Sequence, residues 1–254
     1  MQLSELCARY DDELRTADYA DLDASANGLQ VGPAENEITH VAFAVDGVLE
    51  TFEAAADVGA DALVAHHGIS WGGFDRVTDR TYRRIQALVE NDLALYVSHL
   101  PLDGHQELGN AAGVADLLDL GDREPFGSLG PEYVGTRGRT EEPLSADYLA
   151  HRLDTELEPE QGVQTLDFGP DDIQDVAVVT GSGADWLDEA AEESVDALVT
   201  GEGKQQLYHE AKEAGVTVFL AGHYATETLG VRALQDLADD WGLETTYFDV
   251  PTGL

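Results

Sequence analysis

Runs of apolar residues alternate with amphipathic segments along most of the chain. Leu3, Leu6, Tyr10 and Leu14 fall at helical spacing and predict an opening helix over residues 1–16. Short β-branched and alanine-rich runs, typical of buried strands, then alternate with stretches long enough for amphipathic helices. Alternation of this kind is typical of an α/β fold, in which helices cover largely parallel or mixed sheets.

The same order of elements occurs twice. A strand at 41–45, a helix at 50–58 and a strand at 61–65 return, shifted by 135 positions, at 176–179, 185–194 and 196–200. A further strand follows in each copy, at 95–98 and at 218–221. We therefore predict two related α/β/α units that arose by internal duplication, the first over 1–125 and the second over 175–254. The connecting segment 126–174, rich in Gly, Pro and acids, is predicted to carry a helix at 146–157.

Histidines and carboxylates follow several of these predicted strands directly. The residues in these positions are His66, His67, His99, Asp103, His223 and Glu227. In open α/β sheets, ligands bind beyond the carboxyl ends of the strands. Two adjacent imidazoles are costly to hold close together unless their lone pairs are used, and imidazole with carboxylate suits Zn, Fe, Mn and Ni alike. If the two halves direct these groups into one cleft, the set is sufficient for two divalent metal ions.

The charge of the chain narrows the classes of partner. Its 254 residues contain 51 Asp and Glu against 13 Lys and Arg, which gives a formal net charge of −38. Nucleic acid is not an expected partner, because phosphate backbones are bound by clustered basic residues. An acidic excess spread along the whole chain is typical of a halophilic protein, in which molar salt screens the self-repulsion. Without a long apolar run or a signal peptide, the chain is expected to be cytoplasmic and not membrane-bound.

Several other features have simpler interpretations. The single Cys7 excludes an internal disulfide and a four-thiolate metal site. Basic pairs such as Arg83 and Arg84 are expected to be ordinary surface charges. The three tryptophans, Trp71, Trp186 and Trp241, are expected to be packing residues, and no organic cofactor is predicted.

Four short motifs, in this order, resemble those of the NIF-three-like dinuclear metal-centre family, also labelled GTP cyclohydrolase I type 2 homologues. They occupy residues 27–32 (Asn-Gly-Leu-Gln-Val-Gly), 65–68 (Ala-His-His-Gly), 98–105 (Ser-His-Leu-Pro-Leu-Asp-Gly-His) and 222–227 (Gly-His-Tyr-Ala-Thr-Glu). The resemblance covers nearly the whole chain. Gly68 stands where the family often has Pro, which affects none of the implied ligands.

The resemblance implies a function and a set of roles. The implied metal ligands are His66, His67, Asp103, His223 and Glu227, of which Glu227 bridges the two ions. His99 and Glu202 are implied as nearby catalytic groups that handle protons. The family further implies a homohexameric ring and a small-molecule substrate, hydrolysed with a bridging water as the nucleophile, with GTP ring opening suggested by the family label. A non-enzymatic metal carrier, an assembly or regulatory factor and a structural ring scaffold remain alternatives.

Overall fold

The computed structural model describes residues 1–253 and divides into two compact units. The first comprises Met1–Leu102 and Val231–Val250, and the second comprises Asp103–Gly230 with the short stretch that starts at Pro251. These limits differ from the predicted division at 1–125, 126–174 and 175–254. The difference arises because the predicted connecting segment forms strands of the second sheet, and because the chain returns to the first sheet near its C-terminal end.

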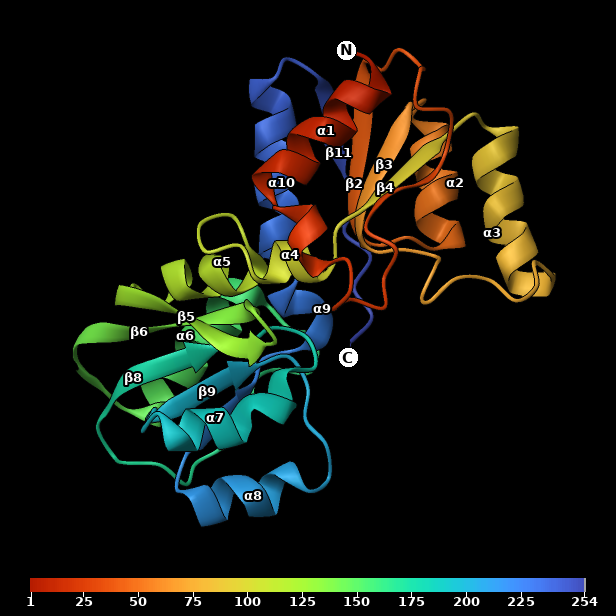
Figure 1. Ribbon diagram of the computed structural model, residues 1–254. Helices are drawn as coiled ribbons and strands as arrows, with labels where there is room; N and C mark the ends of the chain where they lie inside the picture. The colour runs from red at the N-terminus through yellow and green to blue at the C-terminus, as the bar shows by residue number, and fades with distance from the viewer. Residues whose placement is uncertain (254) are drawn as a thin grey trace. The chain divides into compact units, whose positions relative to one another are not determined.

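The first unit is built around a five-stranded sheet in the order β1-β4-β3-β2-β11. The strands are β1 (Gly28–Val31), β2 (His40–Asp46), β3 (Ala62–His67), β4 (Ala94–Val97) and β11 (Glu244–Tyr247). All neighbours pair in parallel except β1, which runs antiparallel to β4. Helices α1 (Leu3–Glu13) and α10 (Thr228–Asp240) lie on one face, and α2 (Leu49–Asp57) and α3 (Asp79–Glu90) lie on the other (Figure 1). A short 3-10 helix (Thr16–Tyr19) follows α1.

The second unit contains a six-stranded sheet in the order β5-β6-β8-β9-β10-β7. Its strands are β5 (Gly121–Leu129), β6 (Glu132–Leu144), β7 (Gln164–Leu166), β8 (Ile173–Val178), β9 (Ala197–Thr200) and β10 (Thr217–Leu220). The three central strands, β8, β9 and β10, are parallel, and the outer ones pair antiparallel. The helices of this unit are α4 (Leu100–Asp103, of which only Asp103 belongs here), α5 (Asn110–Leu117), α6 (Ala146–Leu157), η2 (Gly183–Trp186), α7 (Leu187–Glu192), α8 (Leu207–Ala214) and α9 (His223–Thr226).

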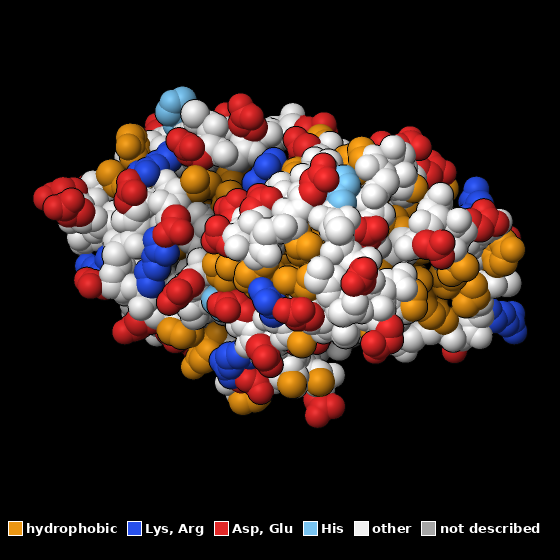
Figure 2. Space-filling model, turned by 90° about the horizontal axis from the view of Figure 1, so that it is seen from above, with side chains coloured by type: hydrophobic (Ala, Val, Ile, Leu, Met, Phe, Trp, Pro, Cys, Tyr) orange, Lys and Arg blue, Asp and Glu red, His pale blue; other side chains and the backbone are white. Residues whose placement is uncertain are grey.

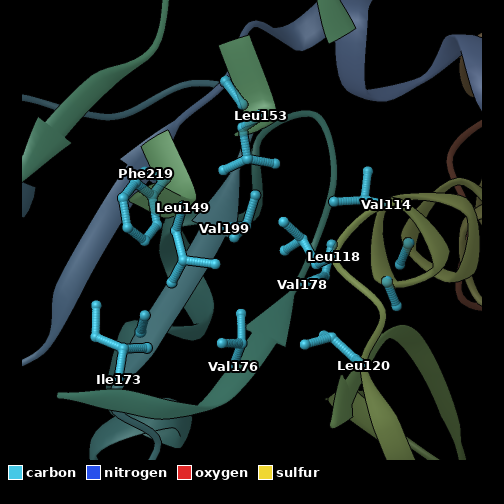
Figure 3. Packing of buried hydrophobic residues seen from close by; sticks show 14 residues of the cluster. Val114, Leu118, Leu120, Leu149, Leu153, Ile173, Val176, Val178, Val199 and Phe219 are labelled. Carbon is cyan, nitrogen blue, oxygen red and sulfur yellow. The ribbon is translucent and has the colours of Figure 1, made fainter. Parts of the chain in front are cut away.

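The core of the second unit shows why these segments form these elements. Alternate residues of the central strands, among them Val176, Val178 and Val199, point toward α5 and α6, as expected for the two-residue period of a strand (Figure 3). Leu149 and Leu153 of α6, one helical turn apart, meet them from the helix side. The helix predicted at 146–157 is confirmed, and Ser145 caps its start by accepting a hydrogen bond from the backbone N–H of Tyr148.

A hydrogen-bond pattern shared by the two units supports the duplication. The Oδ2 atom of Asp61, just before β3, accepts from the backbone N–H groups of Thr39 and His40 at 2.6 and 3.0 Å. Asp196, 135 positions later and just before β9, accepts in the same way from residues 174 and 175, both at 2.9 Å. We call these two carboxylates the strand-start clamps. The predicted α/β fold with a repeated order of strands and helices is confirmed.

The surface is strongly acidic. On the face drawn in Figure 2, Asp and Glu side chains far outnumber Lys and Arg, and apolar side chains lie between them. Among residues 1–253, no helix combines the length and the apolar character that crossing a bilayer requires.

Candidate metal centre

Three histidines lie together at the carboxyl edge of the first sheet. His66 and His67 end β3, and His99 follows β4, so parallel pairing of the two strands brings them to the same edge. The ring centroid of His66 lies 4.6 Å from that of His67 and 5.1 Å from that of His99. One ligand atom from each ring lies within 4.8 Å of the others. These three imidazoles could hold a metal ion.

Each of these imidazoles is oriented by an oxygen atom at its Nδ1. The acceptors are the carbonyl oxygen of Ser98 for His66, a carboxylate oxygen of Asp46 for His67 and a carboxylate oxygen of Asp23 for His99, all at 2.9 Å. Because such oxygens only accept, the neutral ring carries its proton on Nδ1 and its lone pair on Nε2. Metal-binding histidines are held in this way in proteins, so the residues fit a metal ion.

Asp23 is the centre of a buried network that holds His99. Its side chain is 2% exposed. It accepts hydrogen bonds from the backbone N–H groups of Ser25 and Leu100 and from the side-chain amide of Asn27. Asn27 in turn accepts from the backbone N–H of His99 at 2.8 Å. Burial raises the pKa of Asp23, but the hydrogen bonds and charge of His99, with those of Asn27 and Ser25, outweigh it and lower the pKa. Asp23 therefore remains a carboxylate.

The motif at 27–32 also fixes the loop that leaves β3. The Oε1 atom of Gln30 accepts from the backbone N–H groups of Ile69 and Ser70, at 2.9 and 3.2 Å. A Cβ atom on Gly68 would lie 2.5 Å from the amide atoms of Gln30. A side chain at position 68 would therefore require the amide of Gln30 to move.

The second unit places an imidazole between two carboxylates. His223, at the start of α9, has its Nδ1 3.2 Å from Glu202 and its Nε2 3.2 Å from Glu227. Burial lowers the pKa of His223, but the hydrogen bonds and charges of Glu227 and Glu202 outweigh it and raise the pKa to about 9. The hydrogen bond from Ser182 lowers the pKa of Glu202, against the effect of burial, and His223 lowers it further. Without a metal, a proton on His223 neutralises part of the local negative charge.

Two buried carboxylates lie close together in the same unit. Asp103 is 7% exposed and Glu227 is 3% exposed, and each offers an oxygen within 4.8 Å of the other. Asp103 is positioned by hydrogen bonds from Asn110, at 2.9 Å, and from Thr180, at 3.2 Å. Like charges this close and this buried are costly without a compensating cation. The pair is therefore a second arrangement suited to a metal ion.

Glycine at position 181 makes room for this acidic cluster. Gly181 follows β8 with a φ of +57°, and a Cβ atom there would collide with the carboxylate of Glu227. In the first unit the corresponding position, 135 residues earlier, is Asp46, which holds His67. The two copies have thus diverged at equivalent positions: one supplies a carboxylate that orients a histidine, and the other leaves space for a carboxylate.

The structure groups the predicted residues by unit, and it adds two that the sequence reasoning missed. His66, His67 and His99 cluster in the first unit, while Asp103, Glu202, His223 and Glu227 gather in the second. The additions are Asp23 and Asp46. Asp46 directly follows the apolar run 41–45, and this position at the end of a predicted strand could have marked it as a candidate site residue. No comparable pattern in the sequence around Asp23 marks that residue. The expected packing role of Trp71 is wrong: the residue is 46% exposed and lies edge-on to His99, at 4.9 Å between ring centroids.

Comparison with known proteins identifies the relatives of this fold and site. The family model described as Duf34/NIF3 (NGG1p interacting factor 3) matches residues 1–252. The chain belongs to the Duf34/NIF3 family. The resemblance read from the four motifs is confirmed.

Individual Duf34/NIF3 relatives match along the whole chain. A Halobacterium salinarum protein is 58% identical and a Pyrococcus abyssi protein is 42% identical, each with 100% of both chains covered. Both are named GTP cyclohydrolase 1 type 2 homolog. Among solved structures, a protein from Thermus thermophilus is similar with a TM-score of 0.90 and 35% identity, again with 100% of both chains covered.

Proposed function

We propose that this protein is a metal-dependent hydrolase with a dinuclear centre that acts on GTP or a similar nucleotide. The residues that would hold two divalent ions of Zn, Fe, Mn or Ni are His66, His67, Asp103, His223 and Glu227. The names of the full-length relatives support GTP as the first substrate to test. The family resemblance supports a ring of six chains as the working assembly.

The observation that carries the proposal is the orientation of the three histidines. Each Nδ1 faces an oxygen acceptor at 2.9 Å, so each Nε2 carries a free lone pair: those of His66 and His67 are prepared to bind a cation, and that of His99 to accept a proton. Three imidazoles held this way are not explained by packing, because apolar side chains would fill the same space without needing buried acceptors. The buried pair of Asp103 and Glu227 supports a second ion.

Divalent ions in such a centre supply Lewis-acid polarisation and a water of lowered pKa. The residues of the chain position the reacting groups and handle the protons. His99 is proposed to accept a proton at Nε2, because Asp23 holds its Nδ1–H and stabilises the imidazolium that results. Glu202, which contacts Nδ1 of His223 and accepts from Ser182, is proposed to receive and pass on protons at the edge of the acidic cluster.

Metal content and turnover measured on the same sample test the proposal. Protein purified without chelators or affinity tags is analysed for metals and assayed with GTP in the presence of Zn, Mn, Fe or Ni. We expect about two metals per chain and a turnover that is lost in His67→Ala. The matched control is His151→Ala, which removes an exposed histidine of α6.

Two results would contradict this proposal in different ways. Metal content near zero, equal in the parent and in His67→Ala, would refute the centre itself. Two metals without turnover of GTP or related nucleotides would refute the hydrolase and leave the metal-carrier alternative. Sedimentation in the same buffer tests the hexamer, because a particle with the mass of one chain contradicts it.

A further inference from the structure

Four arginines are concentrated in one short stretch of the first unit. Arg76 lies in the loop before α3, and Arg80, Arg83 and Arg84 lie on the helix. They are four of only 13 basic residues in the chain, within nine consecutive positions. Because successive helical residues are about 100° apart, the three on α3 fall within roughly 100° of one another. We call Arg76, Arg80, Arg83 and Arg84 the α3 arginines.

The α3 arginines differ from every other arginine of the chain. Arg9, Arg15, Arg123, Arg137, Arg139 and Arg152 each form an ion pair with a carboxylate, and Arg232 stacks over the ring of Tyr247. By contrast, the guanidinium groups of the α3 arginines form no ion pair with any residue in the described range 1–253. This holds although the chain has 51 carboxylates, two of them, Asp75 and Asp79, in the same stretch.

The position of Arg84 links these arginines to the histidine cluster. Arg84 is half-buried, whereas Arg80 is exposed. Burial lowers the pKa of Arg84 and the charge of Arg80 lowers it further, while Asp46 raises it. Asp46 is the residue that orients His67. The charge of Asp46 thus acts on the guanidinium of Arg84, while its carboxylate contacts the imidazole of His67.

The loop between β3 and α3 provides space and an aromatic surface. An open hollow of about 660 Å³ is lined by Gly73, Phe74, Asp75 and Arg76. The hollow is open to solvent, so a ligand can reach Arg76 freely. Earlier in the same loop, Trp71 is 46% exposed, and its ring centroid lies 4.9 Å from that of His99 and 6.0 Å from that of His67. A half-exposed indole beside the histidines is suited to contact a planar heterocycle.

We propose that the α3 arginines bind the phosphate groups of a nucleotide substrate while Trp71 contacts its base beside His67 and His99. The proposal rests on the proposed function, and it names the residues that select the substrate. Guanidinium groups bind phosphate oxygens in bidentate fashion. The α3 arginines remain available for such binding, because no carboxylate among residues 1–253 forms an ion pair with them. It also explains how a chain of net charge −38 attracts a polyanion: the positive charge is concentrated where the phosphates bind.

Binding of inorganic tripolyphosphate to metal-free protein tests the arginines apart from the metals. The comparison is by calorimetry between the parent, Arg80→Gln/Arg84→Gln and the control Arg9→Gln/Arg152→Gln, which removes the same charge from two ion-paired arginines. KCl is kept at a concentration at which circular dichroism shows folded protein. In 1 M salt the screening length is about 3 Å, so direct contacts persist while long-range attraction is lost.

We expect the Kd for tripolyphosphate to rise about tenfold or more in Arg80→Gln/Arg84→Gln, and to change less than about twofold in the control. Trp71→Leu is expected to weaken binding of GTP and to leave that of tripolyphosphate unchanged. Equal affinity for tripolyphosphate in the parent and in Arg80→Gln/Arg84→Gln would overturn the assignment. Self-association of the parent that is lost in this variant would also overturn it, because the arginines would then bind a second copy of the chain. Because the protein is metal-free, these outcomes are independent of whether the metal centre exists.

Discussion

Replacement of Asp23 by Asn tests how the chain holds His99 in place. Asp23 accepts from four donors, namely two backbone N–H groups, the amide of Asn27 and the ring of His99. In Asn, an NH2 group replaces one of the two carboxylate oxygens, and this group would face the donors that the lost oxygen had bound. Two lost hydrogen bonds at about 1–1.5 kcal/mol each predict a loss of roughly 2–3 kcal/mol. For a chain of this length that lowers Tm by about 4–12 °C.

The pH dependence gives the prediction a second readout. The pKa of Asp23 lies below its ordinary value of 3.8 in the folded protein. A carboxyl group with a lowered pKa stabilises the fold above its unfolded pKa, and this stabilisation is lost as the pH falls through the folded pKa. The deficit of Asp23→Asn should therefore be complete near neutral pH and shrink below pH 3.8. Circular dichroism melts of metal-free protein at several pH values measure it.

Turnover completes this test. Loss of an outer partner at a metal site typically costs about 10- to 100-fold in affinity or activity, and because His99 is proposed to accept a proton, we expect that loss in the turnover of the metal-loaded protein. Asp21→Asn, the same change at an exposed position two residues earlier, is the control. Unchanged Tm and unchanged turnover in Asp23→Asn would refute the argument that the Asp23 network holds His99 in place.

Three further predictions concern other parts of the molecule. Gly181→Ala should weaken zinc binding and lower Tm more than Gly59→Ala. Both glycines have a positive φ, but only Gly181 faces an obstructing carboxylate, that of Glu227. Equal losses in the two variants would show that backbone strain alone matters. The pKa of His223 is about 9 in the metal-free protein, so zinc must displace a proton to bind there. The affinity for zinc should therefore fall as the pH drops below 9, by up to about tenfold per unit. A flat profile between about pH 6 and 9 in a competition titration contradicts His223 as a ligand. Finally, a net charge of −38 predicts a Tm that rises steeply with KCl, and equal melting curves in dilute buffer and in about 2 M KCl would contradict the halophilic interpretation.

The strands and the residues of the candidate metal centre were predictable because both leave local signals. A buried strand is a short apolar run, and a candidate site residue is a polar one at its carboxyl end, as with His66, His67 and His99. The pairing of β11 with β2 leaves no such signal, since residues 244–247 meet residues 40–43 across about 200 positions. The predicted domain limits differ from the observed ones for this reason.

Supporting residues were harder to predict than ligands. Asp23 lies in an irregular loop between a 3-10 helix and β1, and its role appears only when His99, 76 positions later, is brought to it by the sheet. The pair Arg83 and Arg84 was expected to be ordinary surface charge. Arg84 proved half-buried and without an ion pair among residues 1–253, which only the packing of α3 could show.

The two units share the strand-start clamps but differ in the residues at the opposite ends of the same strands. Asp61 and Asp196 fasten adjacent strands at their amino ends, whereas the histidines and acids stand at the carboxyl ends. After duplication, substitutions at the carboxyl ends of the strands could accumulate without disrupting the hydrogen bonds of the clamps at the amino ends. The first unit now presents three imidazoles at this edge, and the second presents an imidazole between two carboxylates, two different environments that a single unit would not contain.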